Sequence, residues 1–197
     1  MSKVIVGNNK KIIISFSGQG SGMGTIPQFE FVNFLEKQYN NYDRHFYLDK
    51  YSKWYHKGID GISKNINETL LYLKEIINYF EDVIFIGSSA GGYAAILFGS
   101  LLNVNKIIAF KPQTIIKSQK EIDNNYINLK QYINTTTKYY IYGDINVVND
   151  NLHHISHCEN INIYPNVILN INYEIDLKKL RDNGTLKNIM DFSINSI

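Results

Sequence analysis

Residues 83–95 read VIFIGSSAGGYAA, and this stretch decides the fold predicted for the chain. Four apolar residues rich in β-branching lead directly into a Gly-x-Ser-x-Gly pattern. The following segment, 93–102, is rich in alanine and leucine and is typical of a helix. The pattern therefore predicts a strand, a sharp turn and a helix, with Ser89 at the tip of the turn. A serine in that position stands at the sheet edge beside a helix N-terminus, so we expect Ser89 to be a nucleophile.

Gly87 and Gly91 flank this serine at a distance of two residues on either side. A turn this tight leaves little room for side chains at those positions, and glycine fits them. The five-residue pattern alone occurs by chance in many proteins. The strand before it and the helix after it are what make it informative.

Through GSSAG at 87–91 and its flanking strand and helix, the chain resembles the α/β-hydrolase superfamily. The resemblance implies an α/β fold with a doubly wound, mostly parallel sheet, in three α/β/α layers, and a serine-centred acyl-transfer chemistry. Further strands are expected at 12–16, 44–48, 106–110, 138–142 and 167–171. A helix that runs from a capping box at Asn65 and Glu68 to about Phe80, and a looser helical segment after the strand at 106–110 as far as about Ile133, alternate with these strands as this class requires. An additional short strand at 4–6 is expected to form a hairpin with the strand at 11–16. The length of 197 residues suits one domain, 1–197.

Composition narrows the class of function. Hydrophobic residues make up 44% and charged residues 19% of the chain, and the net charge is +2. These values argue against disorder and predict neither nucleic acid nor a membrane as partner. The single cysteine, Cys158, excludes an internal disulfide framework. No apolar run suits a signal peptide or a membrane span, so a cytoplasmic protein without a cofactor is expected.

The loop at 17–24 reads SGQGSGMG and follows a buried-type strand. It lacks the Lys-Ser/Thr ending of a phosphate-binding loop, and no clear helix follows at once. The resemblance instead implies an oxyanion hole, with one backbone N–H from Gly18 or Gln19 and the other from Ala90. The alternative is a flexible surface loop.

A serine nucleophile needs a base, and usually a carboxylate that orients the base. The resemblance implies the chain order serine, acid, histidine. Asp144 follows the strand at 138–142 and is the first choice for the acid, although it could be a simple turn residue. Many relatives carry the acid two places further on, where this chain has Asn146. Asp150 is a further possibility.

The resemblance places the histidine after the last strand, but residues 172–176 there include Glu174 and no histidine. All five histidines lie earlier in the chain. His153 is predicted to be the base, with His154 and His56 as alternatives. His153 and His157 also have the i, i+4 spacing of metal ligands, next to Cys158. No further ligands or HExxH pattern accompany them, so no metal site is predicted.

Residues 51–58, YSKWYHKG, hold the only tryptophan and follow the strand at 44–48. Loops that leave the carboxyl ends of parallel strands form the ligand crevice of such folds. Trp54, Tyr55 and His56 are therefore expected to form a substrate wall that suits a sugar ring or an acyl chain. The alternative is that Trp54 fills a small hydrophobic cluster.

Three segments are similar to small bacterial hydrolase-like proteins associated with surface polysaccharide synthesis: the strand, turn and helix start at 85–95, WYHKG at 54–58 and LRDNGTL at 180–186. Some of that group are similar to sugar O-acetyltransferases and esterases. The function predicted is therefore a serine acyl hydrolase or acyltransferase that acts on a small-molecule or saccharide ester. The alternative is a hydrolase-fold protein that has lost catalysis and serves as a binding or assembly module. The acyl group, the acceptor and the oligomeric state stay open.

Overall fold

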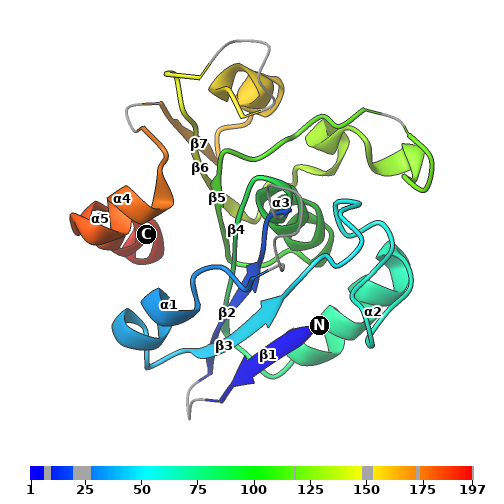
Figure 1. Cartoon of the computed structure of the whole chain (residues 1–197), viewed down its shortest axis with the longest axis horizontal. Coiled ribbons are helices and arrows are strands. Elements are labelled where there is room, and N and C mark those ends of the chain that lie inside the picture. The colour runs from blue at the N-terminus through cyan, green and yellow to red at the C-terminus, as the bar shows by residue number, and fades with distance from the viewer. Residues whose placement is uncertain (7–9, 20–27, 118, 148–152, 172–173, 197) are drawn as a thin grey trace.

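The computed structural model describes residues 1–6, 10–19, 28–117, 119–147, 153–171 and 174–196. Within them, seven strands form one sheet in the order β1-β3-β2-β4-β5-β6-β7 (Figure 1). Only β1 runs antiparallel to its neighbour, and the remaining pairs are parallel. The strands are β1 (Ser2–Ile5), β2 (Lys11–Phe16), β3 (Asp43–Tyr47), β4 (Asp82–Ser88), β5 (Lys106–Phe110), β6 (Lys138–Tyr142) and β7 (Val167–Asn170). The predicted α/β class with a mostly parallel sheet is confirmed.

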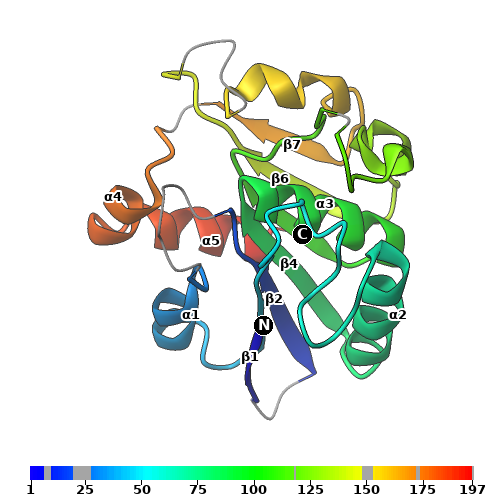
Figure 2. The same cartoon turned by 45° about the vertical axis from the view of Figure 1, so that its right-hand side comes forward.

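Helices cover both faces of the sheet (Figures 1 and 2). On one face lie α2 (Ile66–Ile77) and α3 (Ala90–Leu102), and on the other α1 (Val32–Gln38), α4 (Leu177–Asp182) and α5 (Thr185–Asn195). Three short 3₁₀ segments complete the described structure: η1 (Asn124–Tyr126), η2 (Leu129–Tyr132) and η3 (Ile155–Ile161). None of the helices in the described ranges is long and apolar enough to cross a membrane.

The three layers follow from side-chain alternation along the strands. In β2, Ile12 and Ile14 belong to the core beneath α2 and α3, whereas Ile13 belongs to the core beneath α1 and α5. In β4, Phe85 belongs to the core beneath α2 and α3, and its neighbour Ile86 belongs to the core on the opposite face. Because both faces are buried, these strands are apolar at nearly every position, which is the pattern that predicted them.

Two expectations about local structure were wrong. The first strand does not form a hairpin with β2, since Ser2 lies opposite Tyr47 of β3 and β2 occupies the other edge of β3. The segment after β5, expected to be loosely helical as far as Ile133, contains η1, η2 and a bridge between Ile115 and Asn128. By contrast, the predicted helix start at Asn65 is confirmed, because the Asn65 side chain accepts a hydrogen bond from the Glu68 N–H at 2.9 Å.

The turn between β4 and α3 allows no Cβ at its two flanking glycines. A Cβ on Gly91 would lie 2.0 Å from the carbonyl oxygen of Phe16, and one on Gly87 would lie 2.2 Å from the carbonyl oxygen of Gly91. Both obstacles are backbone atoms, which cannot swing aside. The glycines therefore let α3 approach both its own strand and β2.

Replacing Gly91 by alanine should lower the free energy of unfolding by about 3 kcal/mol, because the methyl group forces backbone apart in a packed region. Urea unfolding monitored by circular dichroism measures this. Gly99→Ala in the same helix is the matched control, since its Cβ would meet side-chain atoms of Ile107 that can shift. Equal losses in the two variants would contradict the account.

Candidate active site

Ser89 forms the tip of the turn between β4 and α3. Its backbone has φ 53° and ψ −119°, a positive-φ conformation that is uncommon for a residue with a side chain. Its N–H donates to the carbonyl of Phe110 at 2.9 Å, which ties the turn to the neighbouring strand. Strained conformations of this kind persist where the surroundings impose them, and they gather at functional sites. Here the strain presents a half-buried hydroxyl at the carboxyl edge of the sheet.

The hydroxyl of Ser89 lies against an imidazole. Its Oγ is 2.7 Å from Nε2 of His153, which is within reach for proton transfer. His153 comes from the segment between β6 and η3, and not from the loop after the last strand. Of the alternatives, His154 instead caps η3, where its side chain accepts a hydrogen bond from the Ser156 N–H.

The end of β6 positions this histidine. Asp144 and His154 form a parallel β-bridge, and the Ile155 N–H donates to the Asp144 carbonyl at 3.3 Å. A Cβ on Gly143 would lie 1.7 Å from Cδ1 of Ile155, so the glycine makes room for that side chain. These contacts hold residues 154–155 beside the sheet, and they bring His153 to Ser89.

The surroundings of His153 favour its neutral form. Burial lowers the pKa of the imidazole, and the positive charges of Lys111 and His157 lower it further. A neutral imidazole at pH 7 can accept a proton from the serine.

Asp144 is buried, and its carboxylate binds backbone. One oxygen accepts the Asn146 N–H at 2.8 Å and the other accepts the Ile175 N–H at 3.1 Å. The side chain thereby joins the end of β6 to the segment that precedes α4. Its role as the orienting acid stays a prediction, and Asp150 lies outside the described residues.

The two predicted oxyanion donors lie beside Ser89. A Cβ on Gly18 would be 3.6 Å from Cβ of Ser89 and 3.0 Å from the carbonyl oxygen of Ser88, so the Gly18 backbone lies directly on the turn. Ala90 begins α3, where a backbone N–H has no acceptor within the helix. Gln19 carries a buried Nε2 that finds no hydrogen-bond partner in the described part of the chain. The rest of the loop, from residue 20, lies outside the described residues.

Sequence reasoning missed Glu30, which contacts the predicted oxyanion donor. The Gly18 N–H donates to Oε2 of Glu30 at 3.2 Å. Burial raises the pKa of the Glu30 carboxyl to about 7, against the opposing effects of the Gly18 N–H and the Lys111 charge. No motif marks this residue, and the one signal in the sequence is a charge between Phe29 and Phe31.

Two cavities meet beside this cluster. One, of about 650 Å³, lies between residues 18–19, residues 28–34 and the helices α4 and α5. The other, of about 690 Å³, reaches Ser88, Lys111 and Asp144. Glu30, Leu177 and Lys178 line both. Polar and charged groups that converge on cavities next to a nucleophile are typical of a ligand site.

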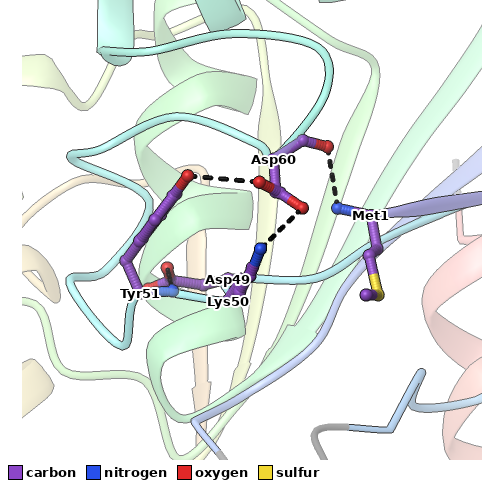
Figure 3. A network of polar contacts seen from close by, with 5 residues as sticks. All are labelled: Met1, Asp49, Lys50, Tyr51 and Asp60. Carbon is purple, nitrogen blue, oxygen red and sulfur yellow. Dashed lines mark hydrogen bonds and ion pairs between the residues drawn. The ribbon is translucent and has the colours of Figure 1, made fainter.

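The aromatic loop after β3 is fixed by two aspartates (Figure 3). The buried carboxylate of Asp49 accepts N–H groups of the loop, from Tyr51, Lys53 and Tyr55, at 2.6–3.1 Å. The carboxylate of Asp60 accepts hydrogen bonds from the Lys50 amine and the Tyr51 hydroxyl. Its carbonyl oxygen accepts one from the N-terminal amine. Trp54 and Tyr55 both have positive φ, so the loop bends tightly back on itself.

This bend turns most of the predicted substrate wall inward. Tyr55 is fully buried and donates its hydroxyl to the carbonyl of Ser17 at 2.9 Å. His56 is buried with Nε2 2.9 Å from the Tyr93 hydroxyl, and burial lowers its pKa to about 4. Contrary to expectation, neither side chain offers a face to a ligand in this structure. Trp54 is half-buried and donates Nε1–H to Gln113 at 2.6 Å.

No group of three or more histidine, cysteine or acidic side chains in the described ranges is arranged to hold a metal ion. The candidate ligands noted in the sequence are separated by their own contacts. His153 faces Ser89, and the buried Cys158 donates its thiol to the carbonyl of Pro112.

Fold and site together define an α/β-hydrolase fold with a serine and a histidine in contact at its nucleophile turn. No family model matches the sequence, and no curated protein matches it. Solved structures do match. The capsule O-acetyltransferase of Neisseria meningitidis serogroup A, as a histidine-to-alanine mutant in complex with CoA, is 19% identical with a TM-score of 0.67, over 96% of this chain and 90% of that one.

Two further structures extend the likeness. A Staphylococcus aureus protein of unknown function is 14% identical with a TM-score of 0.65, over 97% of this chain and 92% of that one. An esterase from Pyrococcus furiosus is 14% identical with a TM-score of 0.58, over 98% and 86%. At these identities the likeness establishes the fold, and it confirms the α/β-hydrolase resemblance at that level.

Replacing Lys111 by glutamine should raise the pKa of His153, because it removes a positive charge that disfavours the imidazolium. An NMR titration of the imidazole Cε1–H measures the change. Lys117→Gln, at an exposed position beyond the same strand, is the control and should leave the titration unchanged. A His153 titration identical in wild type and K111Q would refute this reading of the site.

Proposed function

We propose that the protein is a serine acyl hydrolase or acyltransferase, with Ser89 as nucleophile and His153 as general base. The contact of 2.7 Å between Ser89 Oγ and His153 Nε2 carries the proposal. The strained, positive-φ backbone of Ser89 and the two N–H groups beside it, from Ala90 and Gly18, support it.

In the first half-reaction, His153 Nε2 takes the proton of the Ser89 hydroxyl while Oγ attacks the acyl carbon. The carbonyl oxygen becomes an oxyanion that the N–H groups of Ala90 and Gly18 stabilise. Collapse of the intermediate breaks the bond to the leaving group, which takes the proton from His153, and leaves acyl-Ser89. In the second half, a hydroxyl of water or an acceptor gives its proton to His153 and attacks the acyl carbon. Collapse of this intermediate breaks the bond between the acyl carbon and Ser89 Oγ, which takes the proton from His153, and releases the acid or the acylated acceptor.

The acceptor class proposed is a carbohydrate hydroxyl, in surface polysaccharide synthesis. The similar solved structures include a capsule O-acetyltransferase and an esterase, and one of them holds CoA, so an acyl-CoA thioester is the donor to test first. Cavities of about 650 and 690 Å³, which reach Gly18 and Ser88 respectively, offer space for a sugar-sized acceptor. The Nε2 of Gln19, which has no hydrogen-bond partner among the described residues, is suited to donate to a hydroxyl of the acceptor.

The experiment follows the release of p-nitrophenol from p-nitrophenyl acetate. Ser89→Ala should abolish the stoichiometric burst, and His153→Gln should slow it by about 10²–10⁴-fold, the range for a general base. His154→Asn is the matched control and should keep the wild-type rate, because asparagine also caps a helix and His154 does not touch Ser89.

A parallel assay with acetyl-CoA, with and without oligosaccharide acceptors, separates transfer from hydrolysis by mass spectrometry of the acceptor. A burst that survives in folded Ser89→Ala, or wild-type protein that reacts with no acyl donor, would refute the proposal. The second result would favour a binding or assembly module instead.

A further inference from the structure

The carboxyl group of Glu30 occupies a hydrogen-bond donor that the proposed mechanism requires for the oxyanion. Its Oε2 accepts the Gly18 N–H at 3.2 Å, and this is the N–H assigned to the oxyanion. Its Oε1 would be 3.3 Å from a Cβ placed on Gly18, and that same Cβ would be 3.6 Å from Cβ of Ser89. The carboxyl group therefore lies beside the nucleophile and uses one of its two predicted oxyanion donors.

The surrounding structure fixes Glu30 in this place. Its N–H donates to the hydroxyl of Ser17 at 3.0 Å, and its carbonyl accepts the hydroxyl of Ser15 at 3.3 Å. Both serines are fully buried at the end of β2. The next residue, Phe31, has a left-handed backbone with φ 64°, and its ring stacks on Phe110 with centroids 5.8 Å apart. Two buried serines that anchor Glu30, and a strained residue directly after it, hold the carboxyl in this place, and such strain is typical of functional sites.

We propose that Glu30 gates the oxyanion hole: its ionised carboxylate occupies the Gly18 N–H, and acyl transfer requires that this carboxylate be protonated. This inference rests on the proposed function and adds a control to the same site. An ionised carboxylate accepts a hydrogen bond more strongly than a neutral carboxyl, so it competes with the oxyanion for the donor. It also repels the negative charge that forms on the oxyanion. Protonation weakens the competition and removes the repulsion.

The charges around Glu30 are mixed. Charged side chains from the ends of β5 and β6 and from the segment around α4 line the two cavities beside Glu30. They are Lys111, Asp144, Glu174, Asp176, Lys178 and Arg181. Behind it, burial holds the pKa of the Tyr55 phenol well above its usual range, so that side chain stays neutral. From the end of β2, the described residues are Ser17, Gly18 and Gln19, and none of these side chains titrates. Burial outweighs the Lys111 charge and raises the Glu30 pKa to about 7, so the gate responds near neutral pH.

The sign of the pH dependence follows. His153 must be neutral, so the rate rises as pH increases through its lowered pKa. Glu30 must be protonated, so the rate falls as pH increases above about 7. The wild type should therefore show a bell-shaped profile, whose alkaline limb belongs to Glu30.

The rate of Ser89 labelling by a rhodamine-tagged fluorophosphonate, from pH 5.5 to 9, tests this. Glu30→Gln should lose the alkaline limb and keep the acidic one. At pH 8.5 only about 3% of a carboxyl with this pKa is protonated, so E30Q should label about tenfold faster than wild type or more. At pH 6 the two rates should agree within about twofold. Glu36→Gln, at a half-buried ion-paired carboxylate in α1, is the matched control and should follow the wild type.

A second readout requires neither a variant nor activity. In ¹H–¹⁵N NMR spectra of the wild type, the Gly18 amide should shift with pH, with a midpoint near 7, as its acceptor changes charge. In E30Q that shift should disappear.

An alkaline limb that persists in folded E30Q, or a Gly18 amide that does not respond to pH near 7, would overturn the gate. Normal labelling of both proteins at every pH would refute the gate and leave the proposed function standing. Absence of labelling at every pH, together with a Gly18 titration that E30Q removes, would instead refute the proposed function.

Discussion

The structure depends on one backbone constraint, the sharp turn with positive φ at Ser89. The chain leaves β4, reverses within one residue and enters α3, so the serine side chain cannot pack into either element. The turn is possible because Gly87 and Gly91 carry no Cβ where backbone oxygens lie within about 2 Å of the place it would occupy. The hydrogen bond from the Ser89 N–H to Phe110 fixes its orientation relative to the next strand. Everything that acts on the serine is brought to this point by other strands.

Several chain segments converge on the turn from the same edge of the sheet. The end of β2 supplies Gly18 and, through the hydroxyls of Ser15 and Ser17, anchors Glu30. The end of β6 supplies the bridge at Asp144 that leads to His153. A parallel sheet places all these exits side by side, and this is why residues more than 60 positions apart meet at hydrogen-bond distance. Catalytic geometry in this fold is thus a product of sheet order.

The sequence predicted what local patterns encode. The continuous apolar strands, the capping box at Asn65 and the glycines around Ser89 are local signals, and the sheet and the nucleophile turn follow from them. The contact of His153 with Ser89 depends on a bridge beyond β6, so the sequence offered His153 only among alternatives. The inward fold of Tyr55 depends on left-handed residues that no motif marks. Glu30 was missed because its position depends on hydrogen bonds to Ser15 and Ser17, two buried serines in another part of the chain.

The central claim is that Ser89 is an activated nucleophile facing an oxyanion hole built by Ala90 and Gly18. A crystal structure of the protein after reaction with a fluorophosphonate tests it most directly. We predict phosphorus bonded to Ser89 Oγ, the phosphoryl oxygen within hydrogen-bond distance of both N–H groups, and the Glu30 carboxyl moved from Gly18 or protonated in place. Phosphorus on another residue, or a phosphoryl oxygen directed away from both N–H groups, would contradict the account.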